Sequence, residues 1–179
     1  MFVRAKKIKG RMYAYSVKNT WTERGPRQKV NAYLGKVVKL ESSNSQFNYN
    51  PDIEKEPAQV FMGLAKIELM KLGFKENGDL LENESFFFDT GRMSLSEKKG
   101  RQKEVVLELN EGFLCNVTLN ELMNYKPEND NDGAKLANLL LASGIKVDEG
   151  LFVRLFNRLR GVKEPEQAEQ KEEKVDFYY

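Results

Sequence analysis

The stretch "RMYAYSVKNTWTERGPRQKVNAYLGK", residues 11 to 36, decides the fold of the N-terminal part of the chain. Side chains alternate in character in "RMYAYSV" (11–17) and again in "QKVNAYL" (28–34), and a period of two is typical of half-buried strands. Gly25 and Pro26 lie between the two runs and favour a turn there. The stretch therefore predicts a β-hairpin.

The alternation also predicts which side chains of the hairpin face inward. In the second strand the inward face is apolar and consists of Val30, Ala32 and Leu34. The outward face is basic, polar and aromatic and consists of Arg27, Lys29, Asn31 and Tyr33. In the first strand the two faces are Met12, Ala14 and Ser16 against Tyr13, Tyr15 and Val17.

Two flanking runs extend the hairpin into a sheet. "FVRAKKI" (2–8) predicts a preceding strand, with a turn at Gly10. Gly35 ends or bends the third strand, and "KVVKL" (36–40) can continue as a fourth. We expect an antiparallel meander of three or four strands, either small and barrel-like or an open sheet.

Positive charge is concentrated in this meander. Residues 1–40 contain eleven Lys or Arg and one acidic residue, Glu23, whereas the net charge of the whole chain is only +2. Cations that meet phosphates, together with aromatic rings that stack on bases, are typical of nucleic-acid-binding surfaces. The candidate contacts in the meander are Arg4, Lys6, Lys7, Lys9, Arg11, Tyr13, Tyr15, Trp21, Arg24, Arg27, Lys29, Tyr33 and Lys36. The alternative is that the tyrosines pack within the sheet and the lysines keep a sheet edge soluble.

A second basic turn repeats part of the first. "RGPRQKV" (24–30) and "KKGRQKEV" (98–105) both place a glycine beside Arg-Gln-Lys. The second turn adds four candidate contacts, Lys98, Lys99, Arg101 and Lys103. Both turns can reach one nucleic-acid backbone if the fold brings them together, and a solvated hairpin end is the alternative.

The run from "FVRAKKIKGRMYAYSVKN" (2–19) through "RQKVNAYLGKV" (27–37) resembles the short N-terminal, non-catalytic module of DDE transposases encoded by bacterial and archaeal insertion sequences. The matching positions are Tyr13, Tyr15, Val17, Arg27, Gln28, Lys29, Val30, Tyr33, Leu34 and Gly35. The resemblance covers roughly residues 1–38 and implies that this module binds DNA. The RNase-H-like catalytic domain of those enzymes does not fit behind residue 40, so the resemblance does not imply transposase activity.

The rest of the chain predicts a mixed body. "EPAQVFMGLAKIELMKLG" (56–73) has Pro57 in its first turn and predicts a helix with Val60, Leu64 and Ile67 on its buried side. "ESFFFDTGRMSLSEKKGRQKEVVLEL" (84–109) predicts a hairpin in which the runs Phe86 to Phe88 and Val105 to Leu109 flank a charged tip.

Three helices are expected after this hairpin. Thr118 and Glu121 indicate a capping box for a short helix through Met123. A helical hairpin follows, with helices at about 134–143 and 149–160, Gly144 as the stop of the first and Asp148 as the N-cap of the second. The pair closes the core or, as an alternative, forms a helix-turn-helix.

Composition divides the chain into four parts. We expect a basic β module at 1–40, a linker or long loop at 41–52, an α+β body at 53–162 and an acidic tail at 163–179 that can dock on a protein partner. The overall class is α+β.

The residue types argue against several chemistries. Histidine is absent and Cys115 is the only cysteine, so we expect no metal site, no cofactor, no disulfide and no catalytic activity. No apolar run is long enough to span a membrane, and we expect a cytoplasmic protein with no membrane partner. The sequence favours a non-catalytic nucleic-acid-binding protein, with DNA preferred. The alternatives are an RNA-binding or ribosome-associated component of a ribonucleoprotein assembly, and a protein-interaction module.

Overall fold

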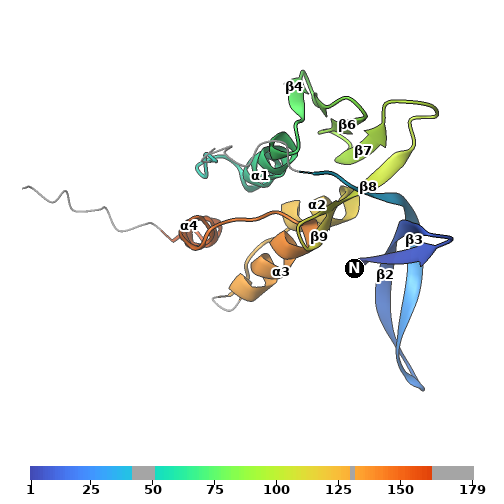
Figure 1. Ribbon diagram of the computed structural model, residues 1–179. Helices are drawn as coiled ribbons and strands as arrows, with labels where there is room; N and C mark the ends of the chain where they lie inside the picture. The colour runs from blue at the N-terminus through green and yellow to red at the C-terminus, as the bar shows by residue number, and fades with distance from the viewer. Residues whose placement is uncertain (42–50, 130–131, 163–179) are drawn as a thin grey trace, which may run out of the picture.

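The computed structural model describes residues 1–41, 51–129 and 132–162. The described residues form an α+β fold, as predicted, with an N-terminal antiparallel meander in an open sheet followed by a mixed body (Figure 1). Most of the predicted linker and the whole predicted acidic tail lie outside the described residues.

The strands in these ranges are β1 (Phe2–Ile8), β2 (Arg11–Thr22), β3 (Gly25–Lys39), β4 (Lys75–Asn77), β5 (Leu80–Glu82), β6 (Phe86–Asp89), β7 (Ser94–Glu97), β8 (Glu104–Leu109) and β9 (Gly112–Leu114). The helices are α1 (Pro57–Lys71), α2 (Asn116–Met123), α3 (Gly133–Ser143) and α4 (Glu149–Leu159).

All these strands belong to one sheet in the order β1-β2-β3-β8-β7-β6-β5-β4, with β9 paired to β8. Neighbouring strands are antiparallel except β3 and β8, which are parallel and set Lys36 opposite Val105. The meander β1–β3 is therefore joined to the body by backbone pairing between β3 and β8.

Two register shifts change the predicted faces of β3. The pairing with β2 skips Leu34 and Asn31, and each skipped residue shifts the alternation by one position. Val30 and Tyr33 consequently lie on the same face, because their β2 partners are two residues apart. The predicted inward face is therefore wrong for Val30, which is 58% exposed on the face of Tyr33. Ala32 pairs with the buried Ser16 but is itself exposed, and Leu34 is half-buried against the apolar cluster that contains Ala14.

The turns of the meander are two residues long. Lys9 and Gly10 both have positive φ, 48° and 81°, as a type I′ hairpin turn requires, and the predicted turn at Gly10 is confirmed. The next turn consists of Glu23 and Arg24, because Thr22 pairs with Gly25. The prediction of Gly25 and Pro26 as the turn is wrong by two positions.

Gly35 bends β3 without ending it, so "KVVKL" continues the same strand and does not form a fourth strand of the meander. At Gly35 φ is 131°, and a Cβ atom would lie 2.6 Å from the carbonyl oxygen of Glu104. The absence of a side chain lets β3 turn away from β2 and approach β8.

The helix α1 is confirmed, with Val60, Leu64 and Ile67 buried as predicted. The predicted hairpin of 84–109 contains an extra strand: β7 lies between β6 and β8 and pairs with both. The prediction of a single hairpin is therefore wrong, and the basic turn at 98–103 connects β7 to β8.

The end of α3 and the start of α4 lie where the sequence predicts them, whereas the start of α2 does not. Gly144 ends α3 with φ of 74°, and the Asp148 side chain caps α4 by accepting a hydrogen bond from Leu151 N at 2.9 Å. In α2 a capping box is present, but Cys115 is its N-cap and Thr118 is its third helical residue. The Thr118 hydroxyl accepts a hydrogen bond from Cys115 N at 3.3 Å, so Thr118 takes part in the capping box, whereas its predicted pairing with Glu121 is wrong.

Alternate residues of β3 and β8 contribute to two apolar clusters. Val38, Val105 and Leu107 belong to the main core, which includes residues of all four helices. Val37 and Val106 belong to a smaller cluster with Ala14 and Cys115. The smaller cluster attaches the inner face of the meander to the body.

Candidate nucleic-acid interface

Three tyrosines lie together on the outer face of the meander. Tyr13 and Tyr15 are two residues apart on β2, and Tyr33 on β3 pairs with Tyr15. The Tyr33 ring centroid lies 5.5 Å from that of Tyr15 and 6.2 Å from that of Tyr13, with tilted planes. Ala14, between the two β2 tyrosines, is fully buried in the smaller cluster. The rings therefore point away from the body.

Cations flank the rings on the same face. On β1, Arg4 pairs with Tyr15 and Lys6 with Tyr13, and on β3 Lys36 also pairs with Tyr13. Residues directly opposite each other on adjacent strands share a face, and all three cations are exposed. The surface made by these residues is called the tyrosine face and consists of Arg4, Lys6, Tyr13, Tyr15, Tyr33 and Lys36.

The ring of Tyr33 is accessible although it packs against its neighbours. Partial burial raises the pKa of its phenol, and the nearby Tyr13 and Tyr15 raise it further. Tyr33 nevertheless remains 59% exposed. An exposed phenol that stays neutral into the alkaline range can stack on a base without repelling phosphates.

A cavity of about 320 Å³ lies beside the tyrosines. Tyr15, Val17 and Val30 give it an apolar and aromatic lining. Gln28 and Arg4 also line it, and the Arg4 guanidinium donates a hydrogen bond to Gln28 Oε1. The cavity thus combines apolar surface with hydrogen-bonding groups, which is a suitable environment for the edge and face of a planar ring.

Beyond Val17 the hairpin consists of β2 and β3 alone, because the pairing with β1 ends where Phe2 meets Val17. This two-stranded extension, residues 18–29, is called the arm, and it points away from the body in Figure 1. Its cations are Lys18, Arg24, Arg27 and Lys29, and its one acidic residue is Glu23. Trp21, near the turn, is 84% exposed.

The arm separates residues that were expected to act together. Lys29 pairs with Lys18 and Arg27 with Thr20, so the register shifts place both cations on the face opposite Tyr33. The prediction that Arg27 and Lys29 share a face with Tyr33 is therefore wrong. Lys18 was missed as a candidate, and a turn placed correctly at Glu23 and Arg24 would have paired it with Lys29.

The remaining candidates of the meander lie around its first turn. Arg11 pairs with Ile8 and shares the face of Tyr13, whereas Lys7 pairs with Met12 and lies toward the inner face. Lys9 is in the turn itself, and all three cations are exposed. Arg11 therefore extends the positive charge of the tyrosine face, whereas Lys7 and Lys9 lie outside that face.

Among the residues that the structure places, the Lys and Arg side chains of the meander from position 4 to position 36 have no carboxylate partner, whereas Lys39 at the end of β3 pairs with Glu108. The ion pairs found there involve Lys39, Lys55, Lys66, Lys71, Arg92, Lys98 and Arg158, together with the N-terminal amine. Every Lys and Arg between positions 4 and 36 is outside this set. Their charge is therefore not neutralised locally and is available to an anionic ligand.

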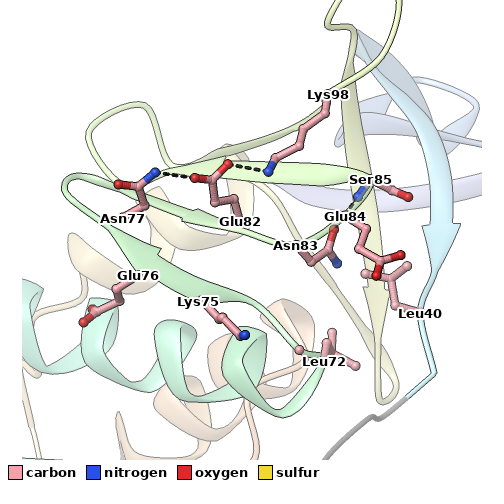
Figure 2. A pocket seen from close by; sticks show the side chains of 11 residues that line it. Leu40, Leu72, Lys75, Glu76, Asn77, Glu82, Asn83, Glu84, Ser85 and Lys98 are labelled. Atoms are coloured by element: carbon pink, nitrogen blue, oxygen red, sulfur yellow. Dashed lines mark hydrogen bonds and ion pairs between the residues drawn. The ribbon is translucent and has the colours of Figure 1, made fainter.

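The second basic turn is only partly available. Lys98 pairs with Glu82, which also accepts a hydrogen bond from Asn77, and these contacts lower the pKa of Glu82 (Figure 2). Lys99, Arg101 and Lys103 are exposed. In Figure 1 the loop between β7 and β8 is at the upper right, and the turn of the arm is at the bottom. The structure therefore does not bring the two basic turns together.

A larger cavity of about 690 Å³ lies near the Lys98–Glu82 pair. Figure 2 shows Lys75 and Glu84 on opposite sides of it. Glu76, also in its lining, is 2.9 Å from Lys66. Because charges of both signs line this cavity, it favours neither an anion nor a cation.

Two further findings apply to positions 1–41, 51–129 and 132–162. No group of three or more His, Cys, Asp or Glu residues in these ranges could hold a metal ion. No helix in the same ranges has the length and apolar character needed to cross a membrane.

Comparisons of the chain with protein-family models, with curated proteins and with solved structures give no match. The functional assignment therefore depends on the geometry and charge of the meander.

Proposed function

We propose that the protein is a nucleic-acid-binding protein, with DNA as its preferred ligand, and that binding rather than catalysis is its role. The observation that supports the proposal most directly is the tyrosine face, where three exposed cations flank three adjacent aromatic rings. The cations contact phosphates and the rings offer stacking surfaces. The preference for DNA follows from the transposase-like motif of residues 13–35.

Most of the binding energy in this proposal comes from phosphate contacts. Such contacts position a protein on nucleic acid without selecting bases, so we expect weak sequence preference. They also release counterions, which makes affinity dependent on salt.

The salt dependence tests the proposal. If about five cations contact duplex DNA, the logarithm of the association constant should fall with the logarithm of salt concentration with a slope of about −4.5. Fluorescence anisotropy with a labelled duplex over a salt series measures this slope. An affinity that is unchanged by salt, or no binding at low salt, contradicts the proposal.

A double variant locates the interaction. Lys6→Gln with Lys36→Gln removes two exposed cations of the tyrosine face and should reduce the magnitude of the slope by about 1.8. The control is Lys126→Gln with Lys146→Gln, which removes two exposed lysines of the body. Equal slopes for the two double variants would mean that charge acts without regard to its position on the molecule.

The rings are tested separately. Tyr33→Ala should weaken binding to single-stranded DNA by about 1–3 kcal/mol if a base stacks on this ring. Because Tyr33 is 59% exposed, the substitution should leave the fold intact, which circular dichroism checks. Competition between duplex DNA, single strands and structured RNA tests the ligand class. Preference for structured RNA would favour a component of a ribonucleoprotein assembly.

A further inference from the structure

The arm extends the sheet without contributing to the core. From Lys18 to Lys29 the side chains on both faces are exposed, apart from the half-buried Thr20 and Gly25. The pairing from Val17 and Val30 to Thr22 and Gly25 covers five residue steps, or about 17 Å of strand. An isolated two-stranded ribbon is at best marginally stable in water. The arm therefore gains little from packing, and its side chains are free for a ligand.

The charges of the arm favour an anionic ligand. Four of its five charged residues are positive, and none of the four is ion-paired within the described residues. One face carries Lys18 and Lys29 as a cross-strand pair beside Arg27. Like charges directly opposite each other destabilise a free hairpin, so an anionic ligand that separates or neutralises them is favoured.

We propose that the arm enters the major groove of duplex DNA, with the Lys18, Arg27 and Lys29 face toward the base edges. This inference rests on the proposed function and specifies how the duplex is engaged. The major groove of B-form DNA is about 12 Å wide and about 8.5 Å deep, and it admits a two-stranded β-ribbon. The deep, narrow major groove of A-form RNA does not admit such side chains.

The choice of face follows from the contacts of the arm. On the opposite face Gln28 is hydrogen-bonded to Arg4. Arginine and lysine, in contrast, are suited to the O6 and N7 acceptors of guanine in the major groove. The hydroxyl of Thr20 donates a hydrogen bond to the Arg27 carbonyl oxygen at 3.2 Å, and this bond restrains the backbone at Arg27.

In this arrangement the tyrosine face lies at the base of the arm. Arg4 and Lys6 are on β1, which pairs with β2 only as far as Val17. These cations lie on the face opposite to Lys18, Arg27 and Lys29, so they do not point to the base edges. The twist of a two-stranded ribbon between its base and its tip is what lets them contact the phosphates beside the groove. Insertion of the arm and phosphate contact by the tyrosine face are thus separable in experiment.

The test uses duplexes whose grooves are blocked selectively. A duplex with glucosylated 5-hydroxymethylcytosine carries sugar groups in the major groove, because the C5 position of the pyrimidine projects there. The full-length protein should bind this duplex at least tenfold more weakly than the unmodified duplex of the same sequence. Netropsin, which occupies the minor groove of A·T-rich duplexes, should not displace the protein.

Two variants test whether the arm causes the difference in affinity between the blocked and the unblocked duplex. Arg27→Gln with Lys29→Gln should reduce the difference between blocked and unblocked duplexes to less than threefold. In a second variant Asn-Gly replaces residues 18–29 and joins Val17 to Val30 by a two-residue turn. It should remove the difference while retaining the circular dichroism spectrum of the body. The control is again Lys126→Gln with Lys146→Gln, which should retain the full difference.

The outcomes separate the two proposals. Salt-dependent binding that is equal for blocked and unblocked duplexes overturns insertion of the arm and leaves nucleic-acid binding intact. Displacement by netropsin also overturns it. Tighter binding to double-stranded RNA than to DNA overturns the major-groove assignment. If no nucleic acid binds at low salt, both proposals fail.

Discussion

Gly35 is the residue at which the chain passes from the meander to the body. Its φ of 131° is accessible mainly to glycine, and the carbonyl oxygen of Glu104 occupies the space of a Cβ atom. Two separate constraints, one on conformation and one on space, therefore apply to the same position. The other glycines of the meander, Gly10 and Gly25, have positive φ but open space around them.

This difference predicts the effect of alanine substitutions. Gly10→Ala should cost about 1 kcal/mol of unfolding free energy, because an alanine must adopt a left-handed conformation in the turn. Gly35→Ala should cost at least about 2 kcal/mol, since it adds a steric conflict with the backbone of β8 to the conformational cost. Urea denaturation of both variants measures the two costs. Equal costs would mean that β3 and β8 separate without penalty.

The Tyr33 phenol predicts a dependence of stability on alkaline pH. Its pKa in the folded protein is raised, mainly by burial and then by Tyr13 and Tyr15, so the folded state retains this proton longer than the unfolded chain does. The contribution to stability is complete below about pH 10, the unfolded value, and is lost as the pH rises through the folded value. The unfolding free energy of the wild type should therefore fall relative to that of Tyr33→Phe above about pH 10. A difference between the two proteins that does not change with pH would contradict this coupling.

At the scale of elements, the ends of helices can be predicted from neighbouring residues, whereas the register of a strand depends on its pairing with other strands. Pro57, Gly144 and Asp148 act within one helical turn, and the helices that they mark agree closely with the structure. The register of β3 depends on its partners, so its two skipped residues leave no local signal. The strand β7 was likewise missed, because its four residues show no clear alternation and all but Glu97 are buried.

The same distinction applies to the candidate site. The concentration of cations and the tyrosines of β2 were predictable, because charge and a period of two are properties of the sequence itself. The placement of Arg27 and Lys29 opposite Tyr33, and the pairing of Lys18 with Lys29, were not predictable from alternation alone. They follow from the turn at Glu23 and Arg24 and from the shifts at Leu34 and Asn31.

The cap of α4 gives a prediction for this helix. Asp148→Ala removes the hydrogen bond to Leu151 N and should lower the unfolding free energy by about 1 kcal/mol. Asp148→Asn keeps an acceptor at this position and should retain most of the stability. Urea denaturation compares the two variants. An equal loss for both would show that the charge of Asp148, and not its hydrogen bond, supports the helix.

At the scale of the whole molecule, the meander and the body share one sheet and one of the two apolar clusters. Ala14 of β2 packs with Val106 of β8 and with Cys115, the N-cap of α2. The division into a basic module at 1–40 and a body at 53–162 stays a prediction. The shared cluster favours a meander that unfolds together with the body.

Native-state hydrogen exchange of the full chain tests this coupling. Amides of β2 between Tyr13 and Ser16 and amides of β8 should open with the same free energy, because exposing Ala14 also exposes Val106. Amides of the arm should exchange faster, since the arm has no part in either cluster. A meander that opens at clearly lower free energy than β8 would instead support two independent folding units.

The parallel pairing of β3 with β8 also has a consequence for how fast the chain folds. The contacts within β1–β3 and within β4–β8 are local hairpins, whereas Lys36 meets Val105 only after a long intervening segment closes into a loop. Closing such a loop costs conformational entropy, and contacts between residues far apart in the sequence are associated with slower folding. We expect the two halves of the sheet to form early and to join late. The rate-limiting step is then the meeting of Lys36–Lys39 with Val105–Glu108.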